Sequence, residues 1–227
     1  MATTPPPGWG MVLATGVFAL SITLLGLVPP GTLGGRVAAS LHVLSTIVHE
    51  AGHAAMSIAT GGGVYVIEIH SPHSGVAYVW FTSWFSSVAT RVAGYAAPPL
   101  AGLGIAVLLG RGQAHTALIL TIVVMVLVLL VSRDLVTVAS VVAVGLVVFA
   151  AGYWGSAGVQ QWTAYIEAWL LLLCETAGLW QLVKYRFDND DAKALAQKTW
   201  IPRPIWILAW FALNGWALWI AAPLLWP

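Results

Sequence analysis

The strongest constraint on the fold is a series of long apolar runs. They cover about residues 9–29, 37–60, 91–110, 115–132, 135–153, 160–182 and 204–226. Each is close to the length of about 20 apolar residues that a transmembrane helix needs. Of the 227 residues, 59% are hydrophobic and 7% are charged, whereas about 25% are charged in soluble domains. We therefore predict an all-α polytopic membrane protein, a single domain over residues 1–227 with about 6–7 transmembrane helices in the lipid bilayer.

The segment between the second and third apolar runs has the composition of β-strands. VYVIEIH at 64–70 and VAYVW at 76–80 are β-branched and aromatic stretches on either side of a Pro/Gly turn. In the first stretch, Tyr65, Ile67 and Ile69 would share one face. Because unpaired strand edges are not tolerated in hydrocarbon, we predict a β-hairpin over 64–80 that is interfacial or packs against helices.

Lys and Arg predict how the bundle is oriented. Five of the nine fall in the longest charged loop, which the positive-inside rule places in the cytoplasm: Lys184, Arg186, Lys193, Lys198 and Arg203. Counting the spans back from this loop puts Arg91 and Arg133 on the same side and Arg36 and Arg111 on the other. The same count predicts a cytoplasmic N-terminus in the cell (plasma) membrane.

The composition also excludes several kinds of site. The net charge is +1 and no dense basic patch exists, so we expect no nucleic-acid partner. Cys174 is the single cysteine and lies in an apolar run, which excludes a disulfide framework and a cysteine-based zinc site.

The second apolar run contains the motif HEAGH. His49 and His53 are four residues apart with Glu50 between them, so on a helix both imidazoles lie on one face and can bind one metal ion. H-E-x-x-H on a helix is the signature of zinc proteases, in which the Glu is the general base. The alternative is a pair of structural core histidines, but ionisable groups inside a span cost several kcal/mol unless they are paired, hydrated or metal-bound. We therefore predict a metal site with His49 and His53 as ligands.

Other ionisable side chains have more ordinary interpretations. His70 and His73 flank a turn and are typical of solvated turn histidines. Glu167 and Glu175 lie in the sixth run, eight residues apart, and do not face each other. One of them would bond a neighbouring helix or mark a proton or ion path.

At this point the sequence resembles the site-2 proteases, a family of intramembrane zinc metalloproteases. The similarity rests on H-E-A-G-H in an apolar helix, the hairpin directly after it, and a following helix with Gly94, Pro98 and Pro99. It is closest to a compact actinobacterial peptidase-like subgroup, which shares a polar break like that at 132–134 and an acidic stretch like DNDDAKALAQKTWIP. The chain contains neither the Asn-Pro nor the Leu-Asp-Gly element that many family members have around the third ligand.

The resemblance implies a function. Zn²⁺ held by His49, His53 and one carboxylate would activate a water molecule, and Glu50 would be the catalytic general base. The implied substrate is a transmembrane protein whose helix unwinds locally before cleavage. The hairpin would bind the unwound strand by adding it to a sheet edge.

We predict Asp134 as the third metal ligand. It follows a polar break between two apolar runs, on the side of the membrane where the second run delivers His53. Glu175 could come near but has no helix breaker beside it to aim it, and Arg133 could pair with Asp134 as a structural lock instead. Three further carboxylates lie on the same side, and a solvated acidic loop is their ordinary explanation: Asp188, Asp190 and Asp191.

Two other classes of protein remain open at this stage. A catalytically inactive metal-binding homologue, or a membrane transporter or binding protein, would keep the bundle without the chemistry. A membrane di-iron hydroxylase or desaturase would need more clustered histidines than the six present. The number and identity of bound metal ions, and the effect of Glu50→Gln, separate these classes.

Overall fold

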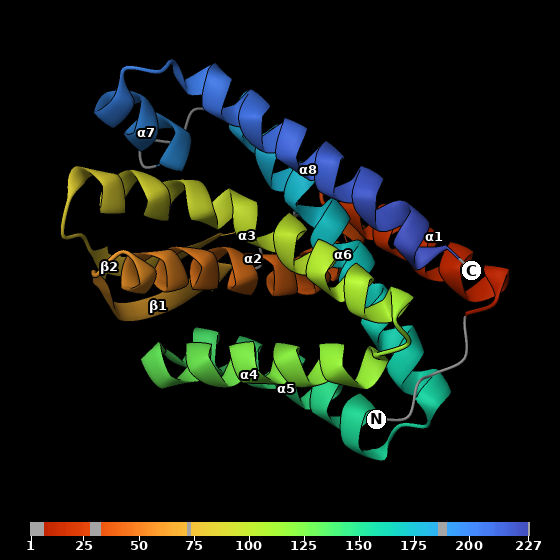
Figure 1. Ribbon diagram of the computed structural model, residues 1–227. Coiled ribbons are helices and arrows are strands. Elements are labelled where there is room, and N and C mark those ends of the chain that lie inside the picture. Colours follow the sequence, from red (N-terminus) through yellow and green to blue (C-terminus); the bar gives the residue numbers. More distant parts are fainter. Residues whose placement is uncertain (1–6, 28–32, 72–73, 186–189, 227) are drawn as a thin grey trace.

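The computed structural model describes residues 7–27, 33–71, 74–185 and 190–226. Within them the chain forms one small sheet and a set of helices (Figure 1). In chain order these are α1 (Trp9–Leu25), α2 (Leu33–Ala59), β1 (Gly63–Ser71), β2 (Ser74–Trp80), α3 (Trp84–Gly110), α4 (Ala114–Val131), α5 (Leu135–Trp154), α6 (Ala157–Lys184), α7 (Asp191–Thr199) and α8 (Arg203–Leu225). The predicted helical bundle with a hairpin after the second helix is confirmed.

Five of the helices in the described ranges are long and apolar enough to cross a membrane: α3, α4, α5, α6 and α8. α1 is apolar but shorter, with 17 residues. α2 has 27 residues, but the polar side chains of its HEAGH motif lower its hydropathy. α3 begins about two turns before the predicted start at residue 91. Its first turns contain Ser86, Ser87 and Thr90, which are polar but buried against protein, so the apolar run alone understated its length.

The hairpin packs against helices, which is one of the two predicted placements. Ile67 and Ile69 are buried, and the backbone N–H of Ile69 donates to Thr137 Oγ1 at the start of α5 (2.6 Å). A β-bulge between Val64 and Val66 takes Tyr65 out of the strand pairing. Its side chain is 66% exposed, so the prediction that Tyr65 shares a face with the two isoleucines is wrong, because the bulge breaks the alternation.

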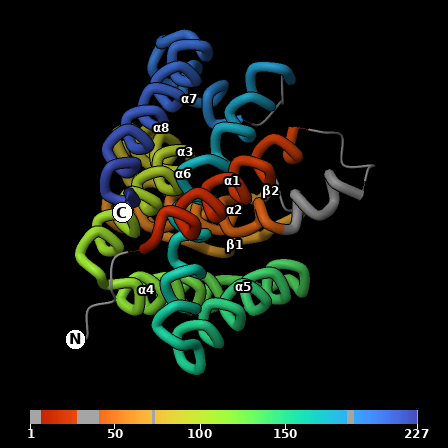
Figure 2. Tube along the Cα trace, turned by 90° about the vertical axis from the view of Figure 1, so that its right-hand side faces the viewer, coloured from red at the N-terminus to blue at the C-terminus, as the bar shows by residue number. Residues whose placement is uncertain are grey.

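The centre of the molecule is α6, which packs against α1, α3, α4 and α8 (Figure 2). α2 and α3 pack closely beside it because small residues line their contact. A Cβ at Gly52 of α2 would lie 2.8 Å from the Ala93 carbonyl oxygen of α3. The HEAGH segment is thereby held against the first half of α3.

The short helix α7 lies against α3 and α8 (Figure 1). Its Ala192 and Leu195 are fully buried in a cluster with α6 and α8 residues, among them Leu179 and Trp210. The stretch that contains Asp190 and Asp191 is therefore packed against the bundle, and the prediction of a solvated acidic loop is wrong for these two residues. Asp188 and His73 lie outside the described residues.

Candidate metal centre

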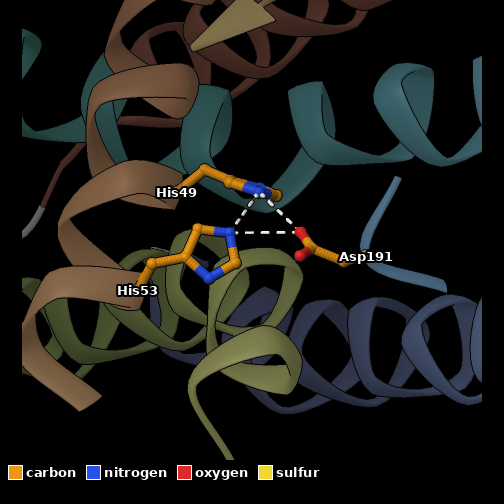
Figure 3. A group of neighbouring side chains, drawn as sticks. All are labelled: His49, His53 and Asp191. Carbon is orange, nitrogen blue, oxygen red and sulfur yellow. Dashed lines mark hydrogen bonds and ion pairs between the residues drawn. The ribbon is translucent and has the colours of Figure 1, made fainter. Parts of the chain in front are cut away.

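Three side chains converge on one point between α2 and α7 (Figure 3). The four-residue spacing puts His49 and His53 on one face of α2, with their Nε2 atoms 3.2 Å apart. Asp191, the first residue of α7, places Oδ2 3.1 Å from His53 Nε2 and 3.7 Å from His49 Nε2. Among the described His, Cys, Asp and Glu residues, these three form the group able to hold a metal ion.

The geometry of this group fits a tetrahedral metal centre. A tetrahedral ion bound at 2.0–2.1 Å to nitrogen and oxygen separates its ligand atoms by about 3.3 Å. The observed separations of 3.1, 3.2 and 3.7 Å bracket that value. Two imidazoles and one carboxylate are also the protein ligands of many catalytic zinc sites, which leave one position for water or substrate.

The remaining ring nitrogens of both histidines are hydrogen-bonded. His53 Nδ1 donates to the Thr90 carbonyl oxygen of α3 (2.7 Å). His49 Nδ1 lies 3.0 Å from Glu175 Oε1 of α6, and the other oxygen of Glu175 accepts from Ser45 Oγ (2.7 Å). With Nδ1 as the donor on each ring, Nε2 is the free lone-pair nitrogen, which is the arrangement that metal-ligating histidines have.

Two α3 residues shape the space beside the imidazoles. At Gly94, a Cβ would lie 2.6 Å from His49 Nε2 and would also overlap the His53 ring. The adjacent Tyr95 places its ring edge-on to His49, with centroids 4.5 Å apart. A glycine at position 94 is therefore what lets α3 approach the two rings.

Glu50 lies between this centre and the hairpin. Glu50 is only 4% exposed. A Cβ at Gly75 would lie 2.9 Å from Glu50 Oε1, so β2 packs directly on this side chain. Glu50 is thus held close to the histidines by its place in HEAGH and against a strand by the hairpin.

Asp191 is placed as a carboxylate. Burial would raise the pKa of Asp191, but as long as no metal is bound and the histidines are protonated, the charge of His53 and hydrogen bonds from His49 and His53 lower it. Its second oxygen, Oδ1, accepts from Arg91 Nη1 of α3 at 3.4 Å. An ionised carboxylate is the form that binds a metal.

The structure does not bring the predicted third ligand, Asp134, to the two histidines. Asp134 is the N-cap of α5, and its Oδ1 accepts from the Thr137 backbone N–H (2.8 Å). It is not part of the group formed by His49, His53 and Asp191. The polar break that suggested a ligand is explained by helix capping, since Asp is a strong N-cap residue.

The sequence did carry a signal for Asp191. Asp190 is the N-cap of α7, with Oδ1 accepting from the Lys193 N–H (2.7 Å), and buried Ala192 and Leu195 follow at helical spacing. A capped, amphipathic turn of this kind predicts a docked helix. Glu175, the alternative third ligand, bonds His49 Nδ1 instead.

One of three comparisons with known proteins identifies a family. A family model described as Peptidase M50B-like matches residues 11–221. The chain belongs to the Peptidase M50B-like family. The search of curated proteins found no match, and neither did the search of solved structures.

Membership in the Peptidase M50B-like family confirms the resemblance to the site-2 proteases. The match begins in α1, ends in α8 and includes HEAGH and Asp191. With its five long apolar helices, this M50B-like protein is an integral membrane protein of a peptidase family.

Proposed function

We propose that the protein is an intramembrane zinc metalloprotease that hydrolyses peptide bonds of membrane-embedded substrates. The observation that carries the proposal is the convergence of His49 Nε2, His53 Nε2 and Asp191 Oδ2 at 3.1–3.7 Å, with Glu50 adjacent in the same helix. Zinc is the metal that best suits two imidazoles and a carboxylate at this spacing.

The residues at the centre have three kinds of role in this proposal: metal ligand, general base and orienting partner. His49, His53 and Asp191 would hold Zn²⁺, which when bound acidifies water and polarises a carbonyl group. Glu50 accepts the proton of the attacking water and passes it to the leaving amine. The bonds from Glu175 and the Thr90 carbonyl keep Nε2 of both imidazoles directed at the centre.

The substrate in this proposal is a transmembrane protein, because the centre lies within a bundle of apolar helices. A helical substrate must unwind locally, since its peptide bonds are otherwise closed into its own hydrogen bonds. The position of the hairpin supports a binding role, because β2 packs directly on Glu50 at Gly75. A peptide strand added along the edge of β2 would pass beside the general base.

We further propose that the end of the bundle with the metal centre faces the cytoplasm of the cell. Arg91 and Arg203 make ion pairs to α7 at this end, and Arg133 lies between α4 and α5 beside the hairpin. Positively charged loops are retained on the cytoplasmic side of the membrane. The predicted cytoplasmic N-terminus does not fit this orientation, because Trp9 at the start of α1 packs on Trp226, at the other end of α8 from Arg203 (ring centroids 4.7 Å apart).

The experiment that tests the proposal compares wild type with Glu50→Gln. The glutamine has a similar shape but cannot accept the proton, so zinc content should stay the same while cleavage of a membrane-embedded substrate falls at least about 10²-fold. Full turnover by Glu50→Gln would remove Glu50 from the mechanism. Zinc binding without cleavage by wild type, over a panel of membrane substrates, would favour an inactive metal-binding homologue.

A further inference from the structure

We propose that the ion pair between Arg203 and Asp190 is a positioning device for the ligand Asp191, and this inference rests on the proposed metal site. Arg203 Nε lies 3.1 and 3.3 Å from the two carboxylate oxygens of Asp190. Its Nη2 lies 3.0 Å from Asp190 Oδ2. The Asp190 side chain is only 4% exposed, so this is a largely desolvated pair with fork geometry.

Arg203 joins three helices at one point. It is the first residue of α8 and forms an ion pair with the carboxylate of Asp190, the N-cap of α7. The same guanidinium donates from Nη2 to the carbonyl oxygens at the end of α6, Leu182 at 2.8 Å and Tyr185 at 3.4 Å. α6 also provides Glu175, which bonds His49. Arg203 therefore ties the start of α7 to the helix that orients a histidine ligand.

Asp190 transmits this restraint to the next residue. Its Oδ1 accepts from both Arg203 Nε and the Lys193 backbone N–H. The cap fixes the first turn of α7, and Asp191 is the first residue of that turn. The direction in which Asp191 leaves the backbone is thus set by the carboxylate that Arg203 holds.

α7 needs such a restraint because it is short. It has 9 residues, and isolated helices of fewer than about 12–15 residues are marginal in water. Ala192 and Leu195 dock it on the bundle, and at its other end Trp84 Nε1 donates to the Lys198 carbonyl oxygen (3.0 Å). Ala192 follows Asp191 but offers only a methyl group, and the Trp84 contact lies at the far end of α7. The Arg203–Asp190 ion pair, by contrast, holds the residue directly before Asp191.

The test uses Arg203→Gln, Asp190→Asn and the double variant in the purified full chain. Asparagine is as good an N-cap as aspartate, so Asp190→Asn removes the ion pair while it keeps the cap. Zinc affinity, measured by competition with a chelator, should fall about tenfold or more in each single variant. The double variant should bind zinc no more weakly than the weaker-binding single variant, because both substitutions remove the same interaction. The visible spectrum of the Co²⁺-substituted protein should change in all three.

Two further variants separate positioning from general stability. Arg203→Lys keeps the charge but loses the fork, so its zinc affinity should lie between those of wild type and Arg203→Gln. Arg111→Gln changes an exposed arginine at the opposite end of α3 and should leave affinity and spectrum unchanged. Thermal melting of the metal-free proteins reports folding separately.

The outcomes distinguish the two proposals. Suppose that wild type binds zinc and that the folded Arg203→Gln and Asp190→Asn variants have the same zinc affinity and Co²⁺ spectrum as wild type. This result would overturn the positioning role alone. Additive losses in the double variant would also overturn it. A wild type that binds neither Zn²⁺ nor Co²⁺ would overturn both the metal site and the device.

Discussion

Asp191 Oδ2 lies 3.1 Å from His53 Nε2, although the two residues belong to α7 and α2, which are far apart in the sequence. The contact closes a group of two imidazoles and one carboxylate with the spacing of a tetrahedral metal site. It also depends on the docking of a 9-residue helix. The proposed active site is thus divided between a long helix within the bundle and a short one at its end.

Removal of the carboxylate behind His49 should weaken metal binding. Glu175→Ala takes away the partner of His49 Nδ1 and of Ser45, and loss of such a partner typically costs 10–100-fold in metal affinity. We expect a loss of about that size in zinc affinity measured by chelator competition. Glu167→Ala is the matched control, because Glu167 lies in the same helix but bonds Thr121 of α4. Equal affinity in wild type and Glu175→Ala would exclude the proposed role of Glu175.

A methyl group at Gly94 should disrupt the centre. In an ordinary helix interior, Gly→Ala stabilises by up to about 1 kcal/mol. At position 94 the Cβ would overlap both imidazoles, so Gly94→Ala should destabilise the fold by about 1–3 kcal/mol and reduce zinc content. Gly104→Ala in the same helix, where a Cβ meets nothing within 4 Å, should do neither. Thermal unfolding and metal analysis of the two variants measure the difference. A Gly94→Ala protein with normal zinc content would contradict the described approach of α3 to the rings.

Asp134 should matter for stability and not for metal binding. Asp134→Ala removes the N-cap bond to Thr137, which should lower the free energy of unfolding by about 1 kcal/mol. Asp134→Asn, which retains the cap, should unfold close to wild type. Both should keep their zinc. Zinc lost from both Asp134 variants would restore Asp134 as a ligand.

Much of the fold could be predicted from local patterns in the sequence. The apolar runs predicted the positions of the long helices, because a helix that is buried or in contact with the bilayer is apolar along its whole length. HEAGH predicted that His49 and His53 lie together, because both imidazoles lie on one helix at a fixed spacing. The bulge at Tyr65 could not be predicted, because it arises from how the two strands pair.

The third member of the site depended on tertiary structure. Asp191 lies in a polar stretch whose composition is typical of solvated loops. Its side chain is only 17% exposed, because Ala192 and Leu195 dock α7 on the bundle and because Arg91 pairs with Asp191 while Arg203 pairs with Asp190. Asp134 has a cap position and a carboxylate as well, and local sequence does not distinguish a capping aspartate from a ligand.

Zinc per chain is the measurement that tests the central claim most directly. It should be determined for the purified wild type and for His53→Ala, Asp191→Ala and Asp134→Ala, each checked for folding. Because the site needs all three ligands, we predict about one zinc per chain in wild type and Asp134→Ala, and little or none in His53→Ala and Asp191→Ala. Equal zinc content in wild type and Asp191→Ala, or none in wild type, would contradict the account.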